Sequence, residues 1–311
     1  MPAIVTHQLF GEDASVLLGD DTLGSQEELM AFLLGNQGPD PLWARFTCSP
    51  RTIQSCRDLA QRMHEGDAAQ LLCALRTCSE HRLRSADSSL GMAFALGFAA
   101  HYLLDSMTHP LILALAYKLE AANPDLLGAQ CELHALIESD IDTWMLWQKR
   151  QKTIDAAPVS TMLASTTHVD HIAGTLVSIV AKELYGIDIA EGEYGRAVCD
   201  YRLAYRLIDP PSKWLRSALI RLESLGRMHS RIEAQTHLVS ASDECASANL
   251  EHERWRNPFT GEISVSSFAD LFHDAILAWP TFSKRLIEGD QRRLTNMIGG
   301  LDFYGKPSET S

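Results

Sequence analysis

Residues 93–112, AFALGFAAHYLLDSMTHPLI, place three side chains that can bind a metal inside an otherwise apolar run. These side chains are His101, Asp105 and His109, which follow one another in steps of four. On a helix, residues four apart lie about 40° from each other around the axis, so all three can face one cavity. Good helix formers surround them, and we therefore predict a helix that carries three potential ligands.

The ends of this helix are also indicated by the sequence. Asp87 or Ser88 can cap its start. Pro110 removes a backbone donor and disfavours helical dihedral angles at His109, so we expect the helix to stop or kink there.

A second stretch, CELHALIESDIDTWMLW at residues 131–147, repeats the pattern with His134 and Glu138 one turn apart. One buried histidine beside a carboxylate is common in protein cores and alone would indicate only a packed polar pair. Two helices that each offer a histidine and a carboxylate are a known way to build a metal site between packed helices. The pair of stretches therefore favours a metal site.

These residues resemble a known family. HYLLDSMTHP (101–110) is similar to the His-x-x-x-Asp segment of the zinc-dependent phospholipase C proteins, which include secreted bacterial phosphatidylcholine-cleaving enzymes and alpha-type toxins. The resemblance spans Met1 to about Ala275, and the last of its segments is similar to the intracellular branch of the family. Its further segments are THQLFG (6–11), GNQGPDPLW (35–43), RMHEGD (62–67), HALIESDID (134–142) and NLEHERWRNPFTGE (249–262).

The resemblance implies an all-α fold of phospholipase C and zinc nuclease type, with a metal cluster in a cleft between helices. It implies one domain at residues 1–305, followed by a frayed tail at residues 306–311. One zinc ion would be held by Asp40, His64, His101 and Asp105, a second by His109, His134 and Glu138, and a third by His7 with Asp105 as a bridge.

The resemblance also implies a chemistry. Zinc-activated water would attack a phosphodiester directly, with Asp40 as the general base and no covalent intermediate. In the secreted enzymes an N-terminal Trp completes one zinc site, whereas none of the six residues before His7 is Trp. We therefore expect two zinc ions and leave a third open. Trp43, Phe46 and Tyr102 are candidate substrate contacts because they lie near ligands in the sequence.

The amino-acid composition disfavours some classes of binding partner. The chain has 27 Lys and Arg against 40 Asp and Glu, a net charge of −13, which disfavours nucleic acid and anionic membranes as partners. Two alternatives to a phospholipase C-type phosphodiesterase stay open: a zinc-dependent single-strand nuclease, and a non-catalytic protein that metal stabilises. The first residues lack a signal-peptide pattern, which predicts a cytoplasmic protein without stable membrane insertion.

The other predicted elements are helices too. The capping boxes SQEE (25–28) and THVD (167–170) start two of them, which Gly35 and Gly186 end. No strand-like alternation is long enough to indicate a sheet. Further helices are predicted at residues 58–75, 192–208, 212–232 and 266–279, and loops at 149–160 and 257–262.

Overall fold

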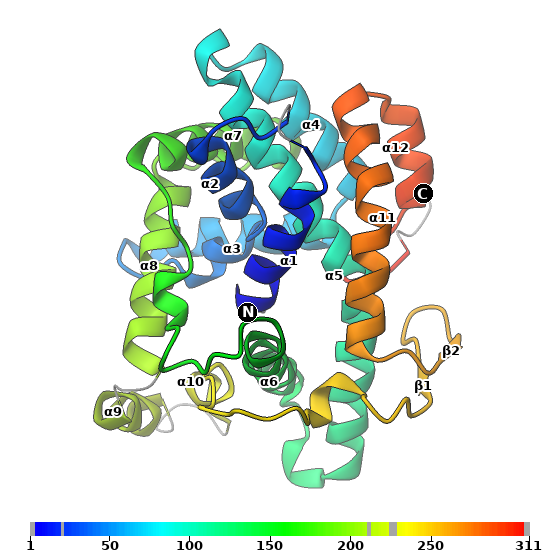
Figure 1. Cartoon of the computed structure of the whole chain (residues 1–311). Helices are drawn as coiled ribbons and strands as arrows, with labels where there is room; N and C mark the ends of the chain where they lie inside the picture. The colour runs from blue at the N-terminus through cyan, green and yellow to red at the C-terminus, as the bar shows by residue number, and fades with distance from the viewer. Residues whose placement is uncertain (1–3, 20–21, 210–212, 224–228, 308–311) are drawn as a thin grey trace.

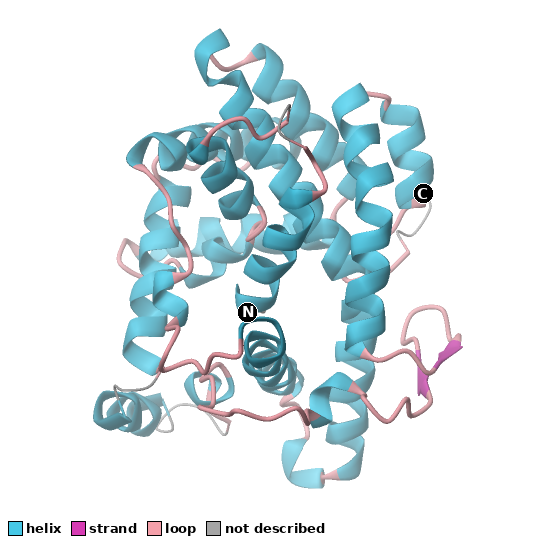
Figure 2. Cartoon of the chain, in the orientation of Figure 1, coloured by secondary structure: helices cyan, strands magenta, loops and turns pink. Residues whose placement is uncertain are grey.

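Helices dominate the computed structural model of the chain (Figure 2), which describes residues 4–19, 22–209, 213–223 and 229–307. The all-α class is confirmed for this part of the chain. The first helices are α1 (Ile4–Val16), α2 (Gln26–Gly35), η1 (Asp40–Ala44, a 3-10 turn), α3 (Pro50–Glu65), α4 (Ala68–His81), α5 (Ser88–Ala122) and α6 (Gln130–Arg150). Those that follow are α7 (Thr167–Tyr185), α8 (Glu193–Ile208), α9 (Lys213–Glu223), α10 (Arg231–Ala234), α11 (Phe268–Glu288) and α12 (Gln291–Ile298).

The long helix α5 lies at the centre of the fold, and six other helices pack on it (Figure 1). It contacts α1, α2, α4, α6, α7 and α11. By length and composition α5 could cross a lipid bilayer, but 83% of its most apolar 18-residue window is buried inside the protein. Here that apolar surface is covered by the neighbouring helices, which makes α5 the core helix of the fold.

We predicted that the helix stops or kinks at His109; the stop is wrong, because α5 continues through Pro110 to Ala122. Proline removes one hydrogen bond, here the one that Ser106 O would accept, and its ring crowds the preceding turn. Gly305 packs directly against Ser106 O and the proline ring: a Cβ atom on Gly305 would lie 2.4 Å from Ser106 O and 2.9 Å from Pro110 Cγ. Burial on both sides of the proline outweighs its local preference.

Two glycines let α2 and α5 cross at backbone contact. A Cβ atom on Gly35 would lie 2.2 Å from Phe94 O, and one on Gly97 would lie 1.9 Å from Phe32 O. No larger residue fits at either position without moving a helix. The crossing brings the loop after α2 directly against the part of α5 that carries the predicted ligands.

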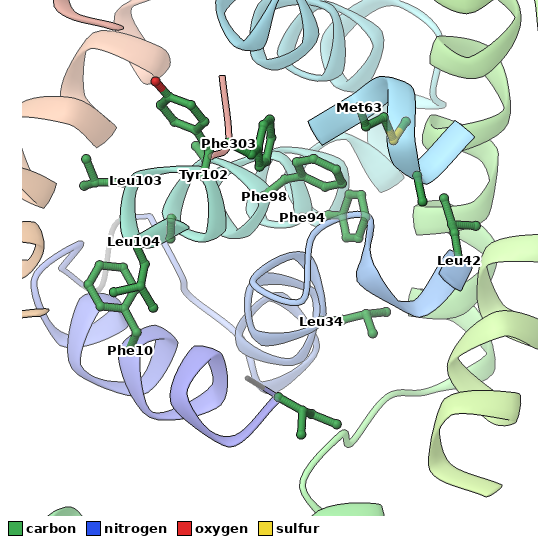
Figure 3. Close-up of a cluster of buried hydrophobic side chains, with 14 of the residues drawn as sticks. Phe10, Leu34, Leu42, Met63, Phe94, Phe98, Tyr102, Leu103, Leu104 and Phe303 are labelled. Atoms are coloured by element: carbon green, nitrogen blue, oxygen red, sulfur yellow. The ribbon is translucent and has the colours of Figure 1, made fainter. Parts of the chain in front are cut away.

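Aromatic side chains fill the core beside the same part of α5. Figure 3 shows Phe94, Phe98 and Tyr102 along the helix with Phe303 next to them, and Phe10 of α1 on the other side. Phe303 packs edge-on against Phe98 and Tyr102, at 6.2 and 5.0 Å between ring centroids. Burying each such side chain stabilises the fold by about 2–3 kcal/mol. The core therefore holds α5, and with it the ligands, in place.

Several predicted helix boundaries need correction. The predicted helix at residues 58–75 is two helices, because Gly66 ends α3 and the side chain of Asp67 caps α4. The N-cap of helix α7 is Thr166, one residue before the predicted Thr167, and Gly186 ends the helix as predicted. The predicted helix at residues 212–232 covers α9 and the first two residues of α10, while residues 212 and 224–228 lie outside the described part.

The C-terminal region contains more helix than the sequence predicts. Helix α11 starts at a capping box of Ser267 and Asp270 and passes Pro280, and α12, which the pattern does not predict, follows it. Two two-residue strands, β1 (Trp255–Arg256) and β2 (Ile263–Ser264), pair around the predicted loop and are too short to show alternation. The predicted frayed tail is wrong at Lys306, whose backbone N–H donates to Asp302 Oδ1.

Candidate metal centre

Helix α5 presents His101, Asp105 and His109 on one buried face. Their relative exposures are 0%, 3% and 3%. Asp105 lies between the two histidines: Oδ2 is 3.1 Å from His101 Nε2, and Oδ1 is 3.6 Å from His109 Nδ1. The four-residue spacing therefore brings the three side chains together in the way that helix geometry predicts.

The first group of potential ligands consists of Asp40, His64 and His101, which come from η1, α3 and α5. Asp40 Oδ1 lies 3.1 Å from His64 Nε2, and Oδ2 lies 3.8 Å from His101 Nε2. All three side chains are buried. Imidazole nitrogens and a carboxylate at these separations are a donor set that suits zinc.

A second group joins His7 of α1 to His101 and Asp105. His7 Nε2 lies 3.1 Å from Asp105 Oδ1, and the His7 and His101 rings stack at 4.1 Å between centroids. Asp105 thus faces imidazoles from both helices. Because its two oxygens point to different histidines, this carboxylate has the placement of a bridge between two ions.

The third group combines His109 of α5 with His134 and Glu138 of α6. Glu138 Oε1 lies 2.9 Å from His134 Nε2 and 3.6 Å from His109 Nε2. His134 is the more exposed member, with 16% of its side-chain surface accessible, whereas the other two are buried. This group therefore lies nearest to solvent.

Several polar atoms in these groups are buried without a hydrogen-bond partner. Such an atom costs about 1–3 kcal/mol unless something binds it. Ions bound in the three groups would satisfy the carboxylate oxygens and His101 Nε2 among them, so the residues present fit zinc. The atoms are His7 Nδ1, both carboxylate oxygens of Asp40, His101 Nε2, Asp105 Oδ2 and Glu138 Oε2.

Backbone carbonyls fix which nitrogen of each histidine is free. His64 Nδ1 lies 2.7 Å from Ala60 O, and His101 Nδ1 lies 3.3 Å from Asn36 O. A carbonyl only accepts, so Nδ1 carries the proton in both rings and Nε2 keeps its lone pair. Hydrogen bonds of this kind orient histidine ligands and select their tautomer in metal sites.

A family model agrees with this geometry. The model, described as zinc dependent phospholipase C, matches residues 6–176, which is more than half of the 311-residue chain. The chain belongs to the zinc-dependent phospholipase C family. The matched region contains all the predicted zinc ligands, from His7 to Glu138, and ends well before Ala275. No curated protein and no solved structure matches the chain.

The charges in the phospholipase C centre are strongly coupled. Burial raises the pKa of Asp105, but the nearby His101, His109 and His7 lower it well below its ordinary value. Burial lowers the pKa of His109, but Asp105 and Glu138 raise it to about 9. Without metal, His109 is therefore a cation at neutral pH, with a proton on each ring nitrogen. An ion that binds one of these nitrogens must displace its proton.

The loop that carries Asp40 is built around Gly38. Its φ is +53°, and a Cβ atom there would lie 2.3 Å from the His101 ring. The carbonyl of Gly38 accepts a hydrogen bond of 2.7 Å from the Tyr194 hydroxyl. Gly38 is therefore fixed on both sides, and the rigid turn sets Asp40 opposite His101.

An ion network that the sequence did not reveal supports His7. Asp142, one turn after Glu138 on α6, accepts hydrogen bonds from the backbone N–H groups of Val5 and Thr6, at 3.0 and 2.7 Å. It caps α1 from another helix and satisfies two of the unpaired donors at that helix start. His237 Nε2 lies 3.1 Å from Asp142 Oδ2 and holds this carboxylate in place.

The second carboxylate at His237 is Asp209, whose Oδ1 lies 3.1 Å from His237 Nδ1. Burial lowers the pKa of His237, but Asp209 and Asp142 raise it to about 10. The ring is therefore a buried cation between two anions. No motif predicts this triad, because its members are far apart in the sequence and follow no helical period.

The C-terminal strap, defined as residues 301–307, is a second feature that the sequence did not reveal. The backbone N–H of Phe303 donates to His64 O at 3.1 Å, and its carbonyl lies 3.1 Å from His109 Nδ1. The strap therefore fixes the tautomer of His109, as Asn36 does for His101. It lies beyond the part of the chain that matches the phospholipase C model.

The three predicted substrate contacts have different surroundings. Trp43 is half-buried, with its ring 6.2 Å from the His64 ring, and Phe46 is 42% exposed. Tyr102 is 2% exposed, and its hydroxyl donates to Leu301 O. This placement makes Tyr102 a core residue and corrects its predicted substrate role, which nearness in sequence alone had indicated.

Proposed function

We propose that this phospholipase C family member is a zinc-dependent phosphodiesterase that hydrolyses a phospholipid or a small soluble phosphodiester by direct attack of water. The observation that supports it most is the set of buried, unpaired ligand atoms that face one another in three adjoining groups. Zinc, when bound, supplies positive charge for phosphate oxygens and lowers the pKa of water from 15.7 to about 7. This chemistry requires no serine or cysteine nucleophile.

Asp40 is the residue to which we assign the general base. It is 1% exposed, and both of its carboxylate oxygens lack a hydrogen bond. A base must lie within hydrogen-bond reach of the proton that it removes, and the rigid turn at Gly38 holds this carboxylate beside His64 and His101. Asp40 can therefore orient a water molecule in the first group and accept its proton.

The surroundings of His101 support the number of ions that we propose. Its Nδ1 is held by Asn36 O, so only Nε2 can bind a metal, and one nitrogen binds one ion. An ion held by Asp40, His64 and His101 leaves the second group with His7 and Asp105. Zinc sites have three or four protein ligands, so we propose two ions and a third site that needs further ligands.

The charge of the chain bears on the substrate. At a net charge of −13, an anionic phosphodiester is repelled at long range and must be bound by local positive charge at the centre. We propose a cytoplasmic enzyme whose substrate contacts include the half-buried Trp43. A zinc nuclease and a non-catalytic, metal-stabilised protein are the alternatives that the following experiment separates.

The test combines zinc content with hydrolysis of phosphatidylcholine, small soluble phosphodiesters and single-stranded nucleic acid. We expect at least two zinc ions per chain and cleavage of a phospholipid or small phosphodiester. Cleavage of single-stranded nucleic acid alone would favour the nuclease. Bound zinc without any hydrolysis would favour the non-catalytic protein, and less than one ion per chain after gentle purification would overturn the proposal.

Asp40→Asn tests the assignment of the base. The variant keeps the size of the side chain and one ligand oxygen, so the His109 group should stay loaded with zinc while turnover falls about 10²–10⁴-fold. Asp188→Asn, at an 85% exposed side chain, is the control and should leave turnover unchanged. Turnover of Asp40→Asn near that of the wild type would remove Asp40 from this role.

A further inference from the structure

The C-terminal strap brings one side chain to the metal centre that no family motif covers. The strap forms a turn held by the side chain of Asp302. The backbone N–H groups of Tyr304 and Lys306 both donate to Asp302 Oδ1 at 2.9 Å. Phe303 then anchors it to His64 and His109 through the two backbone hydrogen bonds described above. The position of the next side chain, Tyr304, is therefore fixed by the backbone on both sides.

The Tyr304 ring lies between ligands of two different groups. It stacks on the His64 ring at 5.7 Å between centroids and 29° between planes. It meets the His109 ring at 5.2 Å and 69°. The ring therefore contacts one ligand of the Asp40 group and one ligand of the His109 group.

Tyr304 is more exposed than the two histidines that its ring contacts. The residue is half-buried, whereas His64 and His109 are 4% and 3% exposed. Among the residues that the structure describes, its hydroxyl has no hydrogen-bond partner, and its oxygen is not among the buried unpaired atoms. Within the described part of the chain, the hydroxyl therefore makes no hydrogen bond that a ligand would have to displace.

We propose that Tyr304 is a substrate-binding residue whose hydroxyl donates a hydrogen bond to a phosphate oxygen of the substrate at the metal centre. This inference rests on the proposed function, because it takes the ligand to be a phosphate ester. A phenolic hydroxyl is a good neutral donor to an anionic oxygen, and such hydrogen bonds are stronger than those between neutral groups. If Tyr304 served only to pack against His64 and His109, a phenyl ring would be sufficient. Removal of the hydroxyl therefore tests the binding role.

Tyr304→Phe removes the hydroxyl and keeps the ring stacked on His64. The backbone anchors at Phe303 are untouched, so we expect zinc content and melting temperature to equal those of the wild type. Inorganic phosphate is the probe, titrated into the zinc-loaded protein. Loss of one hydrogen bond to a charged oxygen should raise its Kd on the order of tenfold.

Tyr117→Phe is the matched control, since it removes a hydroxyl from the far end of α5, where the side chain is 41% exposed. It should leave phosphate binding unchanged. A Kd for Tyr304→Phe within twofold of that of the wild type would overturn the proposal. Loss of zinc from Tyr304→Phe would also overturn it, because the residue would then serve the metal centre itself.

Phosphate binding keeps this test separate from the proposed function. A zinc-loaded wild type that hydrolyses no phosphodiester refutes the phosphodiesterase, yet the phosphate titration still decides whether Tyr304 contacts a bound anion. If hydrolysis is found, kcat/KM of Tyr304→Phe should fall on the order of tenfold. An unchanged kcat/KM together with an unchanged Kd would exclude any contact with substrate.

Discussion

Asp105 is the residue on which most of the metal centre converges. Its two oxygens face His7, His101 and His109, each within 3.6 Å. A carboxylate shared by two ions fixes their separation and offsets part of their repulsion. Glu138, by contrast, faces only the histidines of the third group, and this difference in placement can be measured.

Asp105→Asn should lose more zinc than Glu138→Gln. Both variants keep size and one ligand oxygen but lose a buried negative charge, so they form a matched pair. The charge of Asp105 acts on two groups, whereas that of Glu138 acts on one. Zinc per chain after dialysis is the measurement, and equal losses from the two variants would show that Asp105 is no bridge.

Gly38 governs the element that carries Asp40, and its replacement should distort the centre. Gly38→Ala meets both a positive φ and a Cβ atom 2.3 Å from the His101 ring. Gly128→Ala is the control, since Gly128 has a φ of +81° and nothing within 4 Å of its Cβ position. The strain at positive φ is common to both and costs about 1–2 kcal/mol.

Comparing the two glycine variants separates the backbone strain at positive φ from the steric clash with the His101 ring. We expect Gly38→Ala to lower the free energy of unfolding by at least about 2 kcal/mol more than Gly128→Ala and to weaken zinc binding. Urea denaturation and zinc content check both expectations. Equal destabilisation by the two variants would show that the turn can move away from His101 at no cost.

The sequence predicted the parts of the centre that follow a helical period. His101, Asp105 and His109 repeat every four residues, as do His134 and Glu138, and the helix fixes where such side chains point. The sequence could not decide between a stop and a continued helix at Pro110, because the residue that packs there, Gly305, comes from a distant part of the chain. Phe303, Tyr304 and His237 reach the centre or its support only through long-range packing, which leaves no local pattern.

His237 joins three elements, because Asp142 lies on α6, Asp209 ends α8, and Asp142 also caps α1. The pKa of His237 is about 10 in the folded protein against 6.5 for an ordinary histidine. A raised pKa stabilises the fold fully below pH 6.5, and this contribution disappears as the pH rises to about 10. The displacement corresponds to about 5 kcal/mol at most.

His237→Gln should therefore be much less stable than the wild type at pH 6, and the gap should close towards pH 10. Urea denaturation at several pH values measures it. The exposed His171 provides the control, and His171→Gln should show a small gap at every pH. A gap for His237→Gln that stays constant from pH 6 to pH 10 would mean that the ring is not a buried cation.

On the scale of the whole molecule, the centre connects segments that are far apart in the chain. Its candidate ligands come from α1, η1, α3, α5 and α6, and the C-terminal strap contacts two of them, His64 and His109. Ions at this place would cross-link the N-terminal helix to the central helices. Metal that binds only the folded state adds its binding free energy to stability.

Removal of metal should therefore lower the melting temperature of the entire molecule. One site filled at 1,000 times its Kd adds about 4 kcal/mol, which for a chain of this size corresponds to a shift on the order of 10 °C. Differential scanning calorimetry before and after dialysis against a chelator measures the shift, and added zinc should restore it. Attraction between the protonated His109 and the carboxylates of Asp105 and Glu138 in the metal-free centre would offset part of the loss. An unchanged melting temperature in a sample shown to be free of metal would mean that these side chains do not hold ions between the core helices.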